Sequence, residues 1–599
     1  MICPHCFERD IQGDCGSCGA SIDSKRGIPS VIDRVASDEY EERLSVLADK
    51  DRPLEERLEV IREDYMDGRI VDRFFKPRTV CWRFLIPSAF AGRGLVIGNH
   101  QEKVGLLLAE VLKEVHVVDE SLSRLRALNA VAESEAVEVY PLHGTLESLP
   151  YPRDGFDVIV VQCRADEVTT YLSQLRSFLA EGGSVLLLVD GWPREMGLTY
   201  PVGMGAPEGS LSARFRSALH GCSWRICRNV RNAGLEVAKR YALLSTNRHE
   251  NERVFEAESE RALEWLVAGS GKAANARSFA IARTLAQFTR KTGLLNQSYP
   301  RYLLVCTTGA GETDLREPTE AVLVAGKNRS TVIELGPEGI ELIRKIPNSR
   351  RQAVMNRKAN RITTELPGEL SRTAPQHEIL KTKFGPERQE TQAFGTPLDQ
   401  LLEPTPVSVE KYLDLVFNWI EKLQNKTRTD VEIRRPADIR KELTDNRFDL
   451  TEPPLPKSPI ELPTVISHGD LFGSNIYVHE GEVSHVIDWE WAKNEANPIV
   501  DPGFFLLQLA EYVAEDFESG FETVFLSGGA RSQYLYEAIG TYCERVGVDP
   551  YAFAVYLPIS YVQRSREDIR LNKRLDIDWP GRVRYVWAHH ESIADRLTK

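Results

Sequence analysis

Residues 465–492, VISHGDLFGSNIYVHEGEVSHVIDWEWA, carry three polar side chains at the ends of short apolar runs that are typical of strands. Asp470 and Asn475 lie on a glycine-bearing loop after the run TVI, and Asp488 ends the run VSHVID. This alternation of strand and loop predicts that the three side chains converge. Phosphoryl transfer needs a carboxylate aligned on the acceptor hydroxyl, and oxygen ligands that hold magnesium against the nucleotide phosphates. The three side chains are of the required types.

The pattern HGDxxxxN, followed by an apolar strand and DWE, resembles the aminoglycoside phosphotransferase and choline kinase family, a small-molecule branch of the protein-kinase-like fold. The resemblance implies that the chain binds ATP, that Asp470 orients the acceptor hydroxyl and takes its proton, and that Asn475 and Asp488 hold Mg2+. It also implies that Lys345, in ELIRKIP, steadies the nucleotide phosphates. Asp501, in NPIVDPGFF, matches a family aspartate that braces the catalytic loop.

One position departs from the family pattern. The helix after the lysine strand usually supplies a glutamate that pairs with the lysine, but Arg357 stands near that place and Glu365 is the only acid in NRKANRITTEL. Lys345 then pairs elsewhere, or the enzyme is slow. The departure keeps an alternative open, in which the chain is a catalytically degenerate scaffold that binds ligands without turnover.

The residues around this motif predict an α+β, bilobal kinase-like domain over 312–599. TEAVLVAGKNRSTVIEL and GIELIRKIP predict a small antiparallel sheet, and RRQAVMNRKANRITTELPGEL predicts a helix after it. The basic runs NSRRQAVMNRKANR and SYVQRSREDIRLNKR are expected on solvated helix faces, where either could also meet an anionic substrate. The resemblance implies that the acceptor is a hydroxyl of a small molecule, a sugar or a glycoconjugate.

A different pattern precedes this domain, over 91–311. GLVIGNH, EVHVVDES, FDVIVVQC and GSVLLLVDG are short, Val-rich runs separated by helical stretches. They predict a doubly wound α/β (Rossmann-like) domain whose parallel sheet is covered on both faces. The order of elements resembles a class I S-adenosylmethionine-dependent methyltransferase, with NVRNAGLEVAKRYALLS and PRYLLVCTT as its closing antiparallel pair.

The methyltransferase resemblance implies two contacts to S-adenosylmethionine. Asp119, in VHVVDES, would accept hydrogen bonds from the ribose hydroxyls, and the turn at Gly98 would let the backbone approach the cofactor. Asn99 and His100 follow that glycine where the family is rich in small residues, and Thr145 stands where an acidic adenine contact is common. A bifunctional kinase and methyltransferase is therefore a second enzymatic hypothesis.

Four of the ten cysteines lie in the first twenty residues, as CPHC and CGSC. Paired CxxC spacing in a reducing compartment favours a tetrahedral zinc site over disulfides, although exposed free thiols are the alternative. The ligands would be Cys3, Cys6, Cys15 and Cys18. A closed four-thiolate site has no open position for catalysis, so we expect a zinc ribbon-like knuckle over 1–30 that stabilises a small fold or docks onto a neighbour or partner. A charged helical linker is expected over 31–90.

Composition limits the partners and the compartment. The chain has 599 residues, a formal net charge of -13 and 27% charged residues, so we expect a multidomain protein with no specific nucleic-acid partner. The sequence contains no apolar run long enough to cross a bilayer, and MICPHCFERD lacks the features of a signal peptide, so we expect a cytoplasmic protein. Peripheral membrane association and the oligomeric state stay open.

Overall fold

The computed structural model describes residues 3–8, 14–21, 23–33, 40–62, 74–98, 102–191, 220–245, 252–270, 299–309, 320–401, 406–444, 453–514, 516–573 and 577–598. The chain divides into two compact units. Unit 1 is Met1–Arg350 with Lys383–Gly385, and unit 2 is Arg351–Thr382 with Pro386–Lys599. The sequence places the corresponding boundary earlier, between residues 311 and 312.

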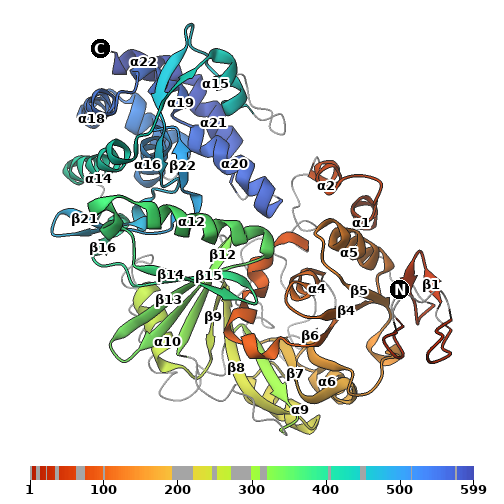
Figure 1. Ribbon diagram of the computed structural model, residues 1–599. Coiled ribbons are helices and arrows are strands. Elements are labelled where there is room, and N and C mark those ends of the chain that lie inside the picture. The colour runs from red at the N-terminus through yellow and green to blue at the C-terminus, as the bar shows by residue number, and fades with distance from the viewer. Residues whose placement is uncertain are drawn as a thin grey trace. The chain divides into compact units, whose positions relative to one another are not determined.

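Five parallel strands form the first half of the sheet in unit 1 (Figure 1). They are β3 (Arg93–Ile97), β4 (Glu114–Asp119), β5 (Tyr140–His143), β6 (Phe156–Cys163) and β7 (Leu179–Asp190). Their order in space is β5-β4-β3-β6-β7, which reverses direction between β3 and β6. This order confirms the doubly wound α/β fold and creates a topological switch point at the carboxyl ends of β3 and β6.

Two antiparallel strands close this half of the sheet, as predicted. β10 (Arg301–Thr307) lies between β7 and β8 (Glu236–Ser245) and pairs antiparallel with both. Their central residues are fully buried, because this part of the sheet is covered on both faces.

The sheet of unit 1 does not end at β8. β9 (Glu252–Glu256) pairs with β8, and β11 (Ala321–Ala325) pairs with β9. β12 (Arg329–Gly336) and β13 (Gly339–Pro347) complete an antiparallel meander. The predicted strands of 320–347 therefore exist, but they extend the α/β sheet. The reason is that β8 leaves one edge unpaired. β9 pairs with that edge, and β11 pairs with the edge that β9 leaves open.

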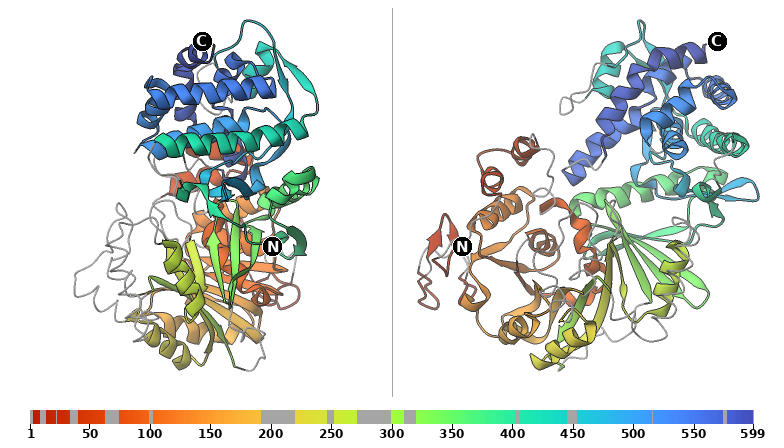
Figure 2. Two further views of the ribbon diagram at one scale, coloured as in Figure 1. Left: turned by 90° about the vertical axis from the view of Figure 1, so that its left-hand side faces the viewer. Right: turned by 180° about the vertical axis from the view of Figure 1, so that it is seen from behind.

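The central strands of the unit 1 sheet are buried on both faces, so alternate side chains enter two different cores. Val96 packs in a core with α4 (Glu102–Ala109) and α5 (Leu122–Ser134). Its neighbours Leu95 and Ile97 pack in a second core with α6 (Val168–Leu175), α9 (Ser223–Asn232) and α10 (Glu260–Ser270). Figure 2 shows α10 against the sheet. The short η3 (Leu146–Ser148) and η4 (Arg176–Phe178) lie in connections.

The segment before β3 contains a small hairpin and short helices. In chain order these are β1 (Ser24–Lys25), β2 (Ile28–Pro29), α1 (Glu41–Leu47), α2 (Leu54–Arg62), η1 (Pro77–Leu85) and η2 (Pro87–Ala89). Buried leucines of α1 and α2 belong to the same core as α5, so this segment packs as part of unit 1.

Unit 2 is an α+β unit in which short strands interrupt a mostly helical body, as predicted. In Figure 2 its C-terminal helices, coloured blue, gather into one bundle with the teal helix α14. Its first part contains α12 (Ala353–Glu365), η8 (Gly368–Thr373), β14 (His377–Thr382), β15 (Gly385–Glu390), β16 (Thr396–Pro397), α13 (Leu398–Leu401), α14 (Pro406–Thr427), β17 (Val431–Arg434) and α15 (Pro436–Leu443), with η7 (Arg350–Gln352) at the unit boundary.

The second part of unit 2 carries the motif quoted above. It contains β18 (Ile460–Pro463), β19 (Val465–Ser467), η9 (Gly473–Asn475), β20 (Ile476–His479), β21 (Glu482–Val486), η10 (Trp489–Trp491) and β22 (Lys493–Ala496). The helices that follow are α16 (Val500–Val513), α17 (Phe517–Phe521), η11 (Glu522–Leu526), α18 (Ala530–Val546), α19 (Pro550–Tyr556), α20 (Ile559–Asn572), α21 (Trp579–Ala588) and α22 (His590–Leu597).

Among the described residues, the helices are all too short or too polar to cross a membrane.

Candidate functional sites

The loop after β19 turns sharply at a glycine. Gly469 has φ +76°, and a Cβ atom on it would lie 2.6 Å from the backbone oxygen of Trp491. Both its conformation and its surroundings therefore require glycine. The turn presents Asp470 directly after the strand end.

Asp501, in the first turn of α16, holds this loop. Its two carboxylate oxygens accept hydrogen bonds from the backbone N–H groups of His468 (2.8 Å) and Gly469 (2.7 Å). The side chain is fully buried, and burial raises the pKa of Asp501 to about 6, although both backbone donors oppose the shift. The loop thus depends on a carboxylate from a helix that follows it in the chain.

His468 connects the loop to the next strand end, a function that the sequence did not predict. The backbone N–H of Asp470 points to Nδ1 of His468 at 3.2 Å, and Nε2 lies 2.8 Å from the carbonyl oxygen of Ile487. An N–H group only donates and a carbonyl only accepts, so Nδ1 is the acceptor and Nε2 carries the proton. The ring also packs edge-on against Trp489, with centroids 4.7 Å apart.

These contacts bring together the residues quoted from the sequence. The side-chain amide of Asn475 donates to the carbonyl of Asp470 at 2.9 Å, and the backbone N–H of Ile487 donates to the carbonyl of Asn475 at 2.9 Å. The next residue, Asp488, has a left-handed backbone (φ 67°) and raises the pKa of Asp470 through its negative charge. Asp470, Asn475 and Asp488 therefore lie at one place in unit 2.

Asp470 has an ionic partner that the sequence did not reveal. Arg564 on α20 forms an ion pair with its carboxylate and donates to the carbonyl of Gly469 at 3.0 Å. The guanidinium carbon lies 4.0 Å from the ring centroid of Trp491. Burial raises the pKa of Asp470 to about 6, and the charge of Arg564 opposes this shift. Arg564 belongs to a basic run that was expected on a solvated face, but its side chain is only 12% exposed.

Two lysines add positive charge beside this arginine. Lys493, in β22, donates to Oε1 of Gln563 at 2.8 Å. Lys358, on α12, is close enough for the charge of Lys493 to depress its pKa, which burial chiefly lowers to about 8. Both lysines are half-buried. The charge of Glu567, on α20, opposes the shift at both lysines, so α12, β22 and α20 carry charges of both signs beside Arg564.

Lys345 lies in β13 of unit 1, whereas Asp470 lies in unit 2. Its side chain is buried, and its neighbour Arg344 forms an ion pair with Glu334 at 3.2 Å. Glu365 ends α12, where it accepts a hydrogen bond from Asn494 at 3.2 Å.

A hollow of about 370 Å3 opens at the carboxyl ends of β3, β4 and β6. Gly98, Asp119 and Thr145 line it, and Gly98 has φ 122°. Asn99 and His100 lie outside the described residues. This is where ligands bind in open α/β sheets.

The carboxylate of Asp119 already has protein partners. Its Oδ1 accepts a hydrogen bond from the backbone N–H of Ser121 at 2.6 Å and lies 2.9 Å from Nη2 of Arg124 on α5. The side chains of Asp119 and Arg124 are both buried. A ribose hydroxyl that binds here must share this carboxylate with Arg124.

The four N-terminal cysteines form one cluster, with all sulfur atoms within 4.8 Å of one another. The sulfur atoms of Cys3 and Cys18 are 3.7 Å apart, and those of Cys6 and Cys15 are 3.5 Å apart. Tetrahedral zinc with Zn–S bonds of about 2.3 Å places its sulfur ligands about 3.8 Å apart. The cluster therefore fits zinc.

Comparison with known proteins gives a family match for one of these regions. Residues 400–522 match the profile of the phosphotransferase enzyme family. No curated protein matches the chain. Solved structures with distant sequences, several of them methyltransferases, also match part of the chain.

Three solved structures illustrate this similarity, and their TM-scores are low. An S-adenosylmethionine-dependent methyltransferase from Aquifex aeolicus is 14% identical, with 32% of this chain and 92% of that chain covered and a TM-score of 0.22. The geranyl diphosphate C-methyltransferase from Streptomyces coelicolor is 13% identical (38% and 77% covered, TM-score 0.23). The [4+2]-cyclase SpnF is 15% identical (38% and 80% covered, TM-score 0.22). The fold assignment rests on the strand order of unit 1.

Proposed function

We propose that this protein is an ATP-dependent phosphotransferase that acts on a hydroxyl of a small molecule, a sugar or a glycoconjugate. The observation that carries the proposal is the convergence of Asp470, Asn475 and Asp488 on a loop that Asp501 and His468 hold in place. Burying the carboxylate of Asp501 is costly, and its hydrogen bonds to two backbone N–H groups offset that cost while they fix the loop that presents Asp470.

In this proposal Asp470 accepts a hydrogen bond from the acceptor hydroxyl and takes its proton. The hydroxyl oxygen forms a bond to the γ-phosphorus of ATP, the bond from that phosphorus to the β–γ bridging oxygen breaks, and ADP leaves. Asn475 and Asp488 are the residues that would hold Mg2+, which neutralises phosphate charge when bound. Lys345 is the proposed phosphate contact.

The ion pair between Arg564 and Asp470 suggests the character of the acceptor. The acceptor must approach a carboxylate that an arginine already contacts, and the charge of Arg564 in turn acts on Lys493. An acceptor that carries its own anionic group would complement these cations. We expect fructose 6-phosphate to stimulate ADP release more than fructose, and the opposite order would remove this refinement without affecting the kinase proposal.

Magnesium-dependent hydrolysis of ATP by the purified protein tests the proposal without a known acceptor, because water can replace the hydroxyl. We expect slow ADP formation that stops when magnesium is chelated. A protein that binds ATP and magnesium without forming ADP would be the degenerate scaffold, with the zinc knuckle as a docking element, and a protein that binds neither would contradict the kinase proposal.

The hollow in unit 1 supports a second function, the binding of S-adenosylmethionine for a coupled methylation. Gly98 and Asp119 are the proposed contacts. Calorimetry with S-adenosylmethionine tests it, and transfer of a labelled methyl group in cell extract tests turnover.

For the knuckle we propose one zinc ion per chain, bound by the four thiolates. Elemental analysis of the parent and of the double variant Cys15→Ser and Cys18→Ser tests this. Unchanged zinc content in the variant would contradict the assignment.

A further inference from the structure

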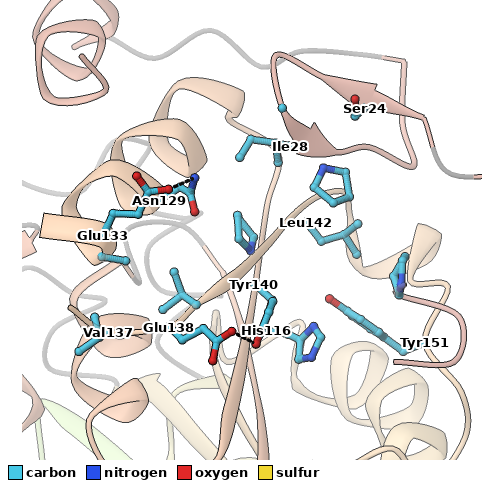
Figure 3. Close-up of a pocket in the computed structure, with 16 residues that line it drawn as sticks. Ser24, Ile28, His116, Asn129, Glu133, Val137, Glu138, Tyr140, Leu142 and Tyr151 are labelled. Carbon is cyan, nitrogen blue, oxygen red and sulfur yellow. Dashed lines mark hydrogen bonds between the residues drawn. The ribbon is translucent and has the colours of Figure 1, made fainter. Parts of the chain in front are cut away.

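A second, larger hollow of about 650 Å3 lies in unit 1, away from the carboxyl ends of the strands. Ile28 and Pro29 of the β1–β2 hairpin form one wall, and β5 with the residues before it forms another (Figure 3). Asn129 and Glu133 of α5 lie at its rim. Neither proposed activity uses this site.

The segment of residues 1–30 that contains the hairpin wall is also attached to the sheet by an aromatic side chain, Phe7. Phe7 stacks on Tyr151 with ring centroids 5.9 Å apart and packs edge-on against His116 at 5.2 Å. The guanidinium carbon of Arg93 lies 3.8 Å from the centroid of the same ring. A Cβ atom on Gly155 would lie 3.2 Å from the ring of Phe7, so the fold leaves room for it. The hollow is therefore bounded by packed elements on both sides.

The floor of the hollow contains an open strand edge. The N–H of Val31 donates to the carbonyl of His143 at 3.0 Å, which covers the outer edge of β5 at its end. Successive peptide groups of a strand point to opposite edges, so the carbonyl of Pro141 points to the same outer edge. The hydrogen bonds of the described residues give this carbonyl no donor there. An acceptor thus faces the hollow.

Tyr151 adds a second polar group without a partner. Its side chain is 5% exposed, and its hydroxyl has no hydrogen-bond partner among the described residues. Figure 3 shows the hydroxyl end pointing toward the middle of the hollow. A buried hydroxyl without a partner is unfavourable, so a ligand that supplies a partner gains affinity from that hydrogen bond.

The charged residues that line the hollow indicate the charge of the ligand that it can bind. Glu133 and Glu138 lie at the rim, and none of the described lining residues is Lys or Arg. Glu133 pairs with Lys50, and Glu138 accepts a hydrogen bond from Tyr140. His116 contacts Glu114 at 2.8 Å, and burial lowers its pKa, so it adds no positive charge at pH 7. The hollow offers acceptors and negative charge beside apolar walls.

We propose that this hollow binds a small organic cation, a protonated amine on a flat apolar body. The amine would donate to the carbonyl of Pro141 and the carboxylate of Glu138. The flat body would lie between Ile28 and Tyr140 and supply a hydrogen-bond partner to the hydroxyl of Tyr151. A volume of about 650 Å3 lies within the usual range for small-molecule sites. The proposal stands independently of the kinase and methyltransferase proposals.

Three probes with the same ring test the proposal on the full-length protein: tyramine (cation), p-cresol (neutral) and 4-hydroxyphenylacetate (anion). Ligand-observed NMR should show that tyramine binds most tightly and 4-hydroxyphenylacetate least. Tyr151→Phe removes only the hydroxyl and should weaken the binding of tyramine about 5-fold. Glu138→Gln should weaken the binding of tyramine about 3-fold and leave the affinity for p-cresol unchanged. Tyr534→Phe, whose hydroxyl bonds Asp414 in unit 2, is the matched control and should change nothing.

Loss of the knuckle wall gives an independent readout. The double variant Cys15→Ser and Cys18→Ser should lose tyramine binding, because Ile28 and Pro29 are no longer held against β5. Equal affinity for the three probes would overturn the proposal, as would tyramine binding that survives in Tyr151→Phe, Glu138→Gln and the double cysteine variant alike.

Discussion

Two strand-end carboxylates, Asp119 in unit 1 and Asp470 in unit 2, each form an ion pair with an arginine, yet their surroundings differ. Asp119 is held by its own chain neighbourhood, since Ser121 and Arg124 belong to the turn and helix that directly follow β4. Asp470 is held by distant segments, because Arg564 comes from α20 and the loop is braced by Asp501 of α16. The comparison teaches that two aspartates with similar sequence surroundings can be positioned differently. Local contacts position the carboxylate in unit 1, and tertiary contacts position the carboxylate in unit 2.

The largest effect should come from Asp470→Asn. This change keeps size and polarity but removes the charge that orients the hydroxyl and takes its proton, so turnover should fall roughly 100-fold or more while nucleotide affinity stays near normal. Rates of ADP formation and ATP titrations measure the two quantities. Asp595→Asn, an exposed aspartate on α22, is the matched control.

Asp488→Asn should have a different signature. It removes an anionic magnesium ligand, so we expect both nucleotide binding and turnover to weaken, by about 10-fold or more, with partial recovery at high magnesium. A magnesium series for ATP hydrolysis checks this. If both this variant and Asp470→Asn hydrolysed ATP like the parent, the scaffold alternative would replace the kinase proposal.

The corresponding change in unit 1 is Asp119→Asn. If S-adenosylmethionine binds, this variant should bind it more weakly by about 1.5 to 3 kcal/mol, because charge-assisted hydrogen bonds to the ribose are lost. Calorimetry measures the difference. No heat with the parent protein, at cofactor concentrations well above the micromolar range, would contradict the proposed cofactor site and leave Asp119 with its structural contacts to Ser121 and Arg124.

The smallest expected effect is the pH dependence of loop stability in unit 2, where Asp501 holds the loop that carries Asp470. The pKa of Asp501 is raised to about 6, so its contribution to loop stability is complete below its ordinary pKa and is lost as the pH rises through 6. The free energy of opening for 465–476, from hydrogen exchange corrected for intrinsic rates, should fall between pH 4 and pH 7 by no more than about 3 kcal/mol. Asp501→Asn cannot ionise, so the fall should be smaller in this variant, and what remains reports Asp470, whose pKa is also raised to about 6. An identical fall in the variant would show that Asp501 does not cause it.

Local patterns predicted much of the fold and part of the candidate sites. The Val-rich runs predicted the parallel strands, because a strand buried on both faces needs apolar residues at every position. The spacing from Asp470 to Asn475 and Asp488 predicted their convergence, because a tight loop and a hairpin leave few other arrangements. The paired CxxC spacing predicted the sulfur cluster for the same reason.

The sequence by itself therefore determined the buried parallel strands, their closing antiparallel pair and the residues whose spacing is short. Tertiary structure alone decided that β11, β12 and β13 extend the sheet of unit 1, that Arg564 pairs with Asp470 and that Pro141 and Tyr151 face a hollow beside the knuckle. The physical reason is that free strand edges and buried charges are satisfied by whichever segment packs against them. That segment can lie far away in the chain, where periodicity and motif spacing carry no information about it.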